Sequence, residues 1–114
     1  MLTGALISEQ LSKGCAGVAT ICAANSLASF PILFAGSDMQ KRDLFDCLNR
    51  GGMACFALTE PGAGSDAGAV SCRAEKVEGG YILNGTKCFI TNDPIADKIT
   101  LFAITREGGG IRGL

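Results

Sequence analysis

The first third of the chain has the spacing of apolar residues that is typical of α-helices. Two pairs of large apolar residues lie four positions apart, Leu2 with Leu6 and Ile7 with Leu11. Gly14 follows Lys13 at the place where a helix C-terminus would be, since glycine commonly terminates helices. The pattern therefore predicts a short helix over about residues 2–13.

A second helix is expected from Cys15 to about Ser29. Its apolar residues surround the helix axis and do not form a single stripe, which predicts a helix that is buried on most sides. Pro31 and Gly36 are expected to close this element, because proline lacks a backbone N–H and breaks the helical hydrogen-bond pattern.

The same region permits a different interpretation, a membrane span. Residues 14–37 carry no charge, and an apolar stretch of this length can cross a bilayer. Asn25 and Ser26 stand near its centre, followed by Ser29 and Pro31, and polar groups of this kind are hard to satisfy in lipid. A core helix is the prediction, with no membrane span.

A third helix is predicted to begin after Ser37. Ser37 and Gln40 have the S-x-x-Q form of a capping box, in which each side chain binds a free backbone N–H of the other residue. Arg50 falls in the expected last turn, and Gly51 and Gly52 follow it. Both features favour a helix C-terminus there.

The period of the pattern changes after Gly52. Residues 54–59 are apolar, residues 70–75 alternate between apolar and polar side chains, and residues 98–105 are rich in β-branched and aromatic residues, as in strands. Turn signals lie at 78–80 and 84–85, and a glycine-rich connection covers 106–113.

These patterns predict an α+β fold. N-terminal α-helices over residues 1–52 would be followed by part of an antiparallel β-barrel or sheet domain over residues 53–114. A few strands without closing partners leave open edges, and an all-apolar helix needs further protein around it. We therefore expect the fold to be incomplete as it stands.

Composition narrows the possible functions. The chain is 47% hydrophobic and 18% charged with a formal net charge of -1, so it is typical of a globular protein with no electrostatic attraction to nucleic acid. It contains no histidine, which excludes Ser-His-Asp and Cys-His hydrolases and histidine-ligated metal sites. We expect no metal site.

Six cysteines are present without a CxxC pair or a preceding secretory signal. This arrangement favours reduced thiols in a cytoplasmic protein. Free cysteine is also among the most buried residue types. Buried small apolar side chains are therefore the expected role for most of them.

The segment from Phe56 to Ala69 is the most unusual part of the sequence. Its glycines, Gly62, Gly64 and Gly68, leave backbone N–H groups uncovered, and Thr59, Ser65 and Asp66 add polar side chains. Such a loop suits a phosphate ester or pyrophosphate. A tight surface turn between two strands explains the same composition.

Two known nucleotide-binding motifs have glycine-rich sequences similar to this part of the chain, but the sequence matches neither of them. A dinucleotide-binding turn must open a helix, whereas an alternating strand pattern follows Gly68. Thr86 precedes Lys87, which is the reverse of the order in a P-loop, and the earlier glycine of that motif is missing.

The run Ala57–Ala69 resembles, at every position, the middle-domain signature of acyl-CoA dehydrogenases. Tyr81–Lys87 and Phe89–Asn92 resemble the next two characteristic blocks of that family. The upstream segments Glu9–Cys15, Asn25–Leu27, Pro31–Leu33 and Gly36–Ser37 are similar to the last helices of its N-terminal domain. The resemblance covers essentially the whole chain. It implies a fragment: residues 1–52 end the helical domain and residues 53–114 begin the β middle domain.

The resemblance implies an FAD enzyme that oxidises an acyl-CoA thioester to the trans-2-enoyl-CoA. A carboxylate base would remove the α-proton while the β-hydride passes to flavin N5. Partners would be the acyl-CoA substrate, an electron-transfer flavoprotein and further copies of the full-length protein in a homo-oligomer. The residues implied at the cofactor are Phe56, Ala57, Leu58, Thr59, Gly64, Ser65, Phe89, Ile90 and Thr91. Ser65 would also contact the CoA moiety.

The sequence departs from the family pattern in two ways. Many members have tryptophan where this chain has Phe89, so an aromatic wall remains without an indole N–H. The family's catalytic glutamate lies in a C-terminal domain, and no residue here matches its motif, so no catalytic residue is assigned. Glu60 is expected to fix the loop, and Asp66 to cap the same turn.

Two other functions stay open. One is a catalytically silent, truncated protein that serves as an interaction module; the other is a sister flavoenzyme such as an acyl-CoA oxidase or a nitroalkane oxidase. Acyl chain length is not predicted, because helices outside this chain are expected to form much of the pocket floor. If the family interpretation is right, the loop from Thr59 to Ser65 and the segment Phe89–Thr91 should face one groove.

Overall fold

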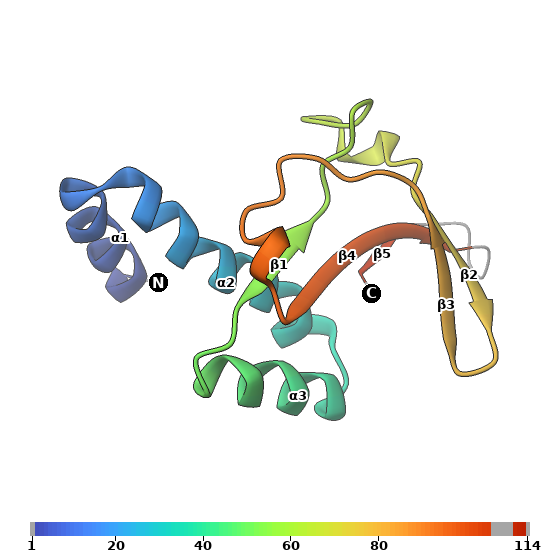
Figure 1. Cartoon of the computed structure of the whole chain (residues 1–114), viewed down its shortest axis with the longest axis horizontal. Coiled ribbons are helices and arrows are strands. Elements are labelled where there is room, and N and C mark those ends of the chain that lie inside the picture. The colour runs from blue at the N-terminus through green and yellow to red at the C-terminus, as the bar shows by residue number, and fades with distance from the viewer. Residues whose placement is uncertain (1, 106–110, 114) are drawn as a thin grey trace.

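The computed structural model describes residues 2–105 and 111–113. Three helices come first: α1 (Leu2–Gly14), α2 (Ala16–Ala35) and α3 (Asp38–Asn49). Five strands follow: β1 (Ala54–Ala57), β2 (Arg73–Val77), β3 (Gly80–Asn84), β4 (Lys98–Thr105) and β5 (Ile111–Gly113). Two single-turn 3₁₀ helices, η1 (Ala67–Ala69) and η2 (Asp93–Ile95), lie in the connections. Figure 1 shows the helices on one side of the sheet, which confirms the predicted α+β fold.

Helix α3 begins and ends as its sequence predicts. The Ser37 side chain accepts a hydrogen bond from the Gln40 N–H, and the Gln40 side chain accepts one from the Ser37 N–H, which completes the capping box. Arg50 is the C-cap, and Gly51 follows with a φ of 88°. That left-handed conformation favours glycine. Local sequence thus determines both ends of α3.

Helix α2 is longer than predicted, since Pro31 lies inside it and the helix continues to Ala35. Packing on both sides of the proline explains the difference. Ala28, which precedes Pro31, is fully buried against Leu44 and Ala54. Ile32, which follows Pro31, packs on the same cluster. These contacts offset the hydrogen bond that proline cannot make.

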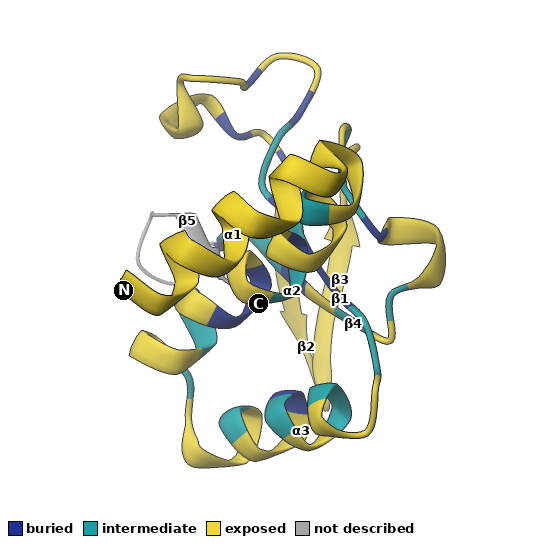
Figure 2. Ribbon diagram, turned by 90° about the vertical axis from the view of Figure 1, so that its left-hand side faces the viewer, coloured by how far each residue is buried: buried dark blue, intermediate teal, exposed yellow. Residues whose placement is uncertain are grey.

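Helix α2 is also less buried than predicted. Only Ala24, Ala28 and Ser29 are buried along it, and Figure 2 shows most of α1 and α2 exposed. The prediction of burial on most sides is therefore wrong for this chain. Among the described elements, those that pack most on α2 are β1, α1, α3 and β4, and they leave most of its apolar residues exposed.

By length and composition alone, α2 could cross a membrane; 11% of the apolar stretch is buried. Two polar contacts tie the helix to the sheet instead. The Asn25 Oδ1 accepts a hydrogen bond from the Ala54 N–H at 2.8 Å, and the Thr100 Oγ1 donates to the Ala28 carbonyl at 2.8 Å. Asn25, one of the polar residues that argue against a lipid environment, thus has a protein partner.

The sheet is mixed, not purely antiparallel as predicted. Strand β4 pairs in parallel with β1 and with β2, whereas β2–β3 and β4–β5 are antiparallel. Adjacent strands joined by a short turn, such as β2 and β3, must be antiparallel. Strand β4 instead returns to β1 after a long connection, which permits the parallel register.

Two small cores hold the molecule together. One lies on the sheet and contains the alternating residues Val70, Cys72 and Ala74 with Ala63 and Ala103. The other joins the helices to β1 through Ala28, Leu44 and Ala54. The alternation predicted over 70–75 is therefore confirmed in burial, although β2 itself begins at Arg73.

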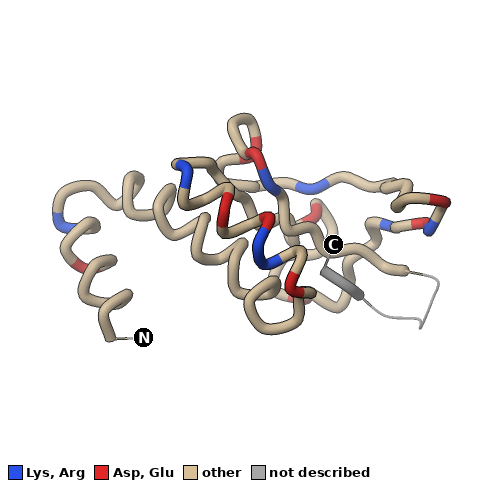
Figure 3. Tube along the Cα trace, turned by 90° about the horizontal axis from the view of Figure 1, so that it is seen from below, with Lys and Arg blue, Asp and Glu red and all other residues tan. Residues whose placement is uncertain are grey.

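Charged residues are distributed unevenly over these elements. Helix α2 carries none, whereas α3 carries charges of both signs along much of its length (Figure 3). The uncharged helix α2 flanks the cavity described below, together with α1, whose charged residues are Glu9 and Lys13.

Candidate functional site

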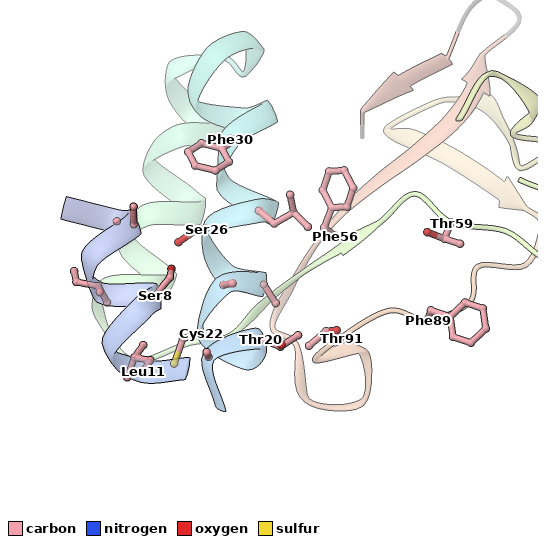
Figure 4. A pocket seen from close by; sticks show the side chains of 17 residues that line it. Ser8, Leu11, Thr20, Cys22, Ser26, Phe30, Phe56, Thr59, Phe89 and Thr91 are labelled. Atoms are coloured by element: carbon pink, nitrogen blue, oxygen red, sulfur yellow. The ribbon is translucent and has the colours of Figure 1, made fainter. Parts of the chain in front are cut away.

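A cavity of about 880 Å³ lies between α1 and α2 on one side and β1 with two loops on the other (Figure 4). The β side contributes Phe56, Thr59, Phe89 and Thr91. The helices contribute Gly4, Ala5, Ile7, Ser8, Leu11, Ala19, Thr20, Cys22, Ala23, Ala24, Ser26, Leu27 and Phe30. The walls are mainly apolar, with hydroxyl groups at a few points, as is usual in small-molecule sites.

The structure brings together four residues that the sequence singles out. Phe56 is on β1, Thr59 lies just after it, and Phe89 and Thr91 are in the loop before η2, yet all four line the one cavity. The expectation that the Thr59 loop and the 89–91 segment share a groove is met at Thr59, Phe89 and Thr91. Their roles toward a cofactor remain a prediction.

The other predicted residues do not line the cavity. Ala57 alternates with Phe56 along β1 and is buried away from the cavity, and Leu58 packs against the sheet core. Gly64 and Ser65 lie exposed farther along the loop, and Ile90 is half-buried between Phe89 and Thr91. These five predictions are neither confirmed nor contradicted by their placement.

Phe89 has an unusual backbone. Its φ is 57°, a left-handed conformation that is strained for a bulky residue, and its side chain is 92% exposed. Strain of this kind is maintained only where the surroundings impose it. The ring of Phe89 is thus held at the cavity by its neighbours and not by packing of its own.

Asn92 supplies one of those constraints. It also has a positive φ, 73°, which asparagine tolerates better than most residues. Its buried side-chain amide donates to the Ile21 carbonyl of α2 at 3.2 Å and to the Ala54 carbonyl of β1 at 3.4 Å. The segment that carries Thr91 is therefore attached to both sides of the cavity.

Glu60 fixes the loop that follows Thr59. Its carboxylate accepts hydrogen bonds from the Ser71 N–H and Oγ, both at 2.7 Å, and from the Cys72 N–H at 2.9 Å. The Lys87 Nζ lies 2.8 Å from the same carboxylate, and the two side chains are only 3% and 9% exposed. These contacts support the predicted loop-fixing role.

The electrostatics of Glu60 agree with that role. Burial of the carboxylate acts to raise its pKa, but the hydrogen bonds from Lys87, Ser71 and Cys72 outweigh burial and lower the pKa to about 2. A carboxylate that holds its proton this weakly is a poor general base near neutral pH. Asp66 caps η1 as predicted, since its Oδ1 accepts from the Gly68 N–H.

Residues of α1 and α2 supply most of the lining, and the sequence did not single them out. Ser8, Thr20 and Ser26 place hydroxyl groups in the cavity wall, and Ala19 and Ala23 leave space beside it. The available signal was the absence of charge from 14 to 37, which equally indicates a core or a membrane helix.

The cysteines form no metal site among the described residues. Cys55 and Cys72 are buried, Cys47 and Cys88 are half-buried, and Cys15 and Cys22 are exposed. All six are free, so the prediction of reduced thiols agrees with the structure, whereas the prediction of burial holds fully for two.

Comparison with known proteins places this geometry in a family. The protein-family model described as "Acyl-CoA dehydrogenase, N-terminal domain" matches residues 1–52, and the family model described as "Acyl-CoA dehydrogenase, middle domain" matches residues 55–114. The chain is 46% identical over 111 residues to a 3-(aryl)acrylate reductase of Clostridium sporogenes, which covers 95% of the chain and 29% of the relative. It is 42% identical over 108 residues to the mitochondrial short-chain specific acyl-CoA dehydrogenase of Rattus norvegicus, covering 93% and 26%.

A solved structure shows the same arrangement. The glutaryl-CoA dehydrogenase of Mycobacterium smegmatis in complex with FADH2 matches with a TM-score of 0.84 and 38% identity, covering 93% of this chain and 28% of that one. This chain thus spans less than a third of the length of the relatives it matches. That TM-score shows that the helices and the mixed sheet of this chain follow the fold of that structure. The chain belongs to the acyl-CoA dehydrogenase family.

Proposed function

We propose that this chain forms the junction of the helical and β domains in an FAD-dependent acyl-CoA dehydrogenase that oxidises an acyl-CoA thioester to the trans-2-enoyl-CoA. The observation that carries the proposal is that Phe56, Thr59, Phe89 and Thr91 line one cavity with α2. These residues come from separate segments of the sequence. Their convergence follows from the fold and not from the signature alone.

The cavity fits the cofactor in size and chemistry. Its volume of about 880 Å³ falls within the range of pockets that hold small molecules and cofactors. Phe56 and Phe89 offer aromatic surface for a flat ring system, and the hydroxyl groups of Thr59 and Thr91 can donate hydrogen bonds to ring heteroatoms. FAD, when bound, would supply the hydride acceptor.

The remaining predicted contacts extend this site along the chain. Ala57, Leu58 and Ile90 would contribute backbone groups beside the ring system. Gly64 and Ser65 would contribute to phosphate binding, with Ser65 also near the CoA moiety. The exposed position of Gly64 and Ser65 leaves their donors accessible to a ligand that reaches beyond the cavity.

The described cavity lining contains no aspartate or glutamate. Glu60 has both carboxylate oxygens engaged by Lys87, Ser71 and Cys72. The dehydrogenation needs a base for the α-proton, and no described residue of the lining provides one. We therefore infer that the 114-residue chain is inactive by itself.

Several finer assignments belong to the same proposal. The full-length protein would be a cytoplasmic homo-oligomer of fatty acid metabolism that uses acyl-CoA substrates and an electron-transfer flavoprotein. A sister flavoenzyme such as an acyl-CoA oxidase would use the same cavity with another electron acceptor. A catalytically silent interaction module would have no need of the cavity.

A measurement of FAD binding distinguishes the hypothesis of a flavoprotein from that of a silent interaction module. We expect the 114-residue chain to bind FAD weakly in an equilibrium fluorescence anisotropy titration and to lose it on gel filtration, because much of the cofactor would lie outside this chain. Thr59→Val and Thr91→Val should each weaken binding by about tenfold, the effect expected for loss of a hydrogen bond to a ligand. Thr86→Val changes an exposed threonine outside the lining and should have no effect.

Two results would contradict the proposal. One is the absence of any FAD binding at millimolar concentrations of the cofactor. The other is equal affinity in the three threonine variants and the unaltered chain.

A further inference from the structure

Two segments that line the cavity are joined by a pair of hydrogen bonds. The Lys87 Nζ donates to the Leu58 carbonyl at 2.9 Å, across 29 residues of sequence. The Cys88 N–H donates to the Thr59 carbonyl at 3.0 Å. Thr59 is itself a lining residue, and Cys88 directly precedes the lining residue Phe89. The two bonds therefore set the spacing of two parts of the cavity wall.

The amine of Lys87 is held in place by Glu60. The Lys87 side chain is 9% exposed and lies 2.8 Å from the Glu60 Oε1, and Glu60 is held in turn by three donors of Ser71 and Cys72. A buried ion pair is weak evidence for a stabilising role, because well-packed apolar residues often stabilise a fold as much. A satisfied polar network does, however, specify one geometry.

Phe89 depends on this geometry more than other wall residues do. Its backbone is in the left-handed region, and its ring is almost fully exposed, so neither local preference nor packing fixes it. The residues on either side are fixed instead: Cys88 by the Thr59 carbonyl and Asn92 by α2 and β1. Loss of the first constraint would let Phe89 relax toward an ordinary conformation.

We propose that Glu60 and Lys87 are positioning residues that hold the Thr59 and Phe89 parts of the cavity wall at a fixed separation. The ligand that this spacing serves, FAD, rests on the proposed function. The spacing itself rests on the contacts above. The two parts can therefore be tested separately in the 114-residue chain.

The first test measures amide hydrogen exchange by NMR in the ligand-free chain. Lys87→Met keeps the aliphatic stem and removes the charge; it should accelerate exchange of the Cys88 amide by at least about tenfold. The Asp97 amide, which donates to the Met53 carbonyl at 2.8 Å away from the pair, serves as an internal reference and should change less than about twofold. Lys98→Met removes the more exposed Lys98–Asp43 pair and should leave the Cys88 amide unaffected.

The second test is the FAD titration. Lys87→Met should raise the dissociation constant for FAD by about tenfold or more, and Lys98→Met should not change it. If Lys87→Met does not fold by circular dichroism, Ser71→Ala replaces it, because this change removes only one of the bonds to Glu60. Ser71→Ala should accelerate Cys88 exchange by between about two- and tenfold.

The outcomes distinguish the two ideas. Equal acceleration of the Cys88 and Asp97 amides would show that the pair acts only on global stability and would overturn the inference. Unchanged Cys88 exchange would overturn it as well. Local acceleration in a chain that never binds FAD would support the positioning role and contradict the proposed function.

Discussion

Glu60 is a buried carboxylate whose hydrogen bonds make it a weak base. Its pKa is lowered to about 2 from the ordinary 4.5, because the hydrogen bonds from Lys87, Ser71 and Cys72 outweigh the effect of burial. A carboxylate with a lowered folded-state pKa stabilises the fold fully above its unfolded pKa. That contribution is lost progressively as the pH falls from about 4.5 to about 2.

The residue-scale prediction is that Glu60→Gln lowers the free energy of unfolding at pH 7 by about 3–5 kcal/mol, since it leaves the buried Lys87 amine without its charge partner. The difference from the unaltered chain should be constant above pH 5 and should shrink toward pH 2. Urea unfolding across this pH range measures it. Glu9→Gln, which removes an exposed pair with Lys13, should cost less than about 1 kcal/mol. A difference that grew as the pH fell would refute the assigned sign.

Phe89 gives a second prediction at this scale. Left-handed backbone costs a non-glycine residue roughly 1–2 kcal/mol, and the exposed ring of Phe89 offers little packing in return. Phe89→Gly should therefore leave the free energy of unfolding unchanged or raise it by up to about 1 kcal/mol, while it weakens FAD binding. Ile90→Gly, at a half-buried neighbour without positive φ, should be destabilising. Marked destabilisation by Phe89→Gly in chemical unfolding would show that its ring packs more than its exposure indicates.

At the scale of elements, α3 tests how much local sequence contributes. Ser37→Ala removes the acceptor for the Gln40 N–H and should lower the free energy of unfolding by about 1 kcal/mol. Ser37→Asn preserves a side-chain acceptor at the N-cap and should retain most of the stability. Thermal unfolding followed by circular dichroism compares the two. Equal losses in both variants would mean that the capping box is dispensable once α3 packs through Leu44.

For the whole molecule, the prediction concerns catalysis. The 114-residue chain supplied with FAD should not reduce an electron-accepting dye in the presence of butyryl-CoA or octanoyl-CoA. The described lining lacks an acidic residue, and a missing general base alone removes about 10²–10⁴-fold of rate. Dye reduction above a protein-free control would contradict this expectation. Glu60→Gln would then show whether that carboxylate is responsible after all.

The sequence by itself determined the features that depend on nearest neighbours. The capping box of Ser37 and Gln40, the glycine after α3 and the alternation of Val70, Cys72 and Ala74 each follow from a few adjacent residues. The sequence also indicated the family, which the family models confirm. It singled out Thr59, Phe89 and Thr91, which line one cavity. Local rules suffice where the physical cause is local.

Only the tertiary structure decided the features whose cause lies far along the chain. Helix α2 continues through Pro31 because Ala28 and Ile32 pack on α3 and β1. Strand β4 pairs in parallel with β1, which the long connection between them permits but does not require. The partner of Glu60 is Lys87, on another loop, although the sequence indicates only that each is charged. Spatial neighbours of this kind follow from the packing of whole elements, which no local pattern records.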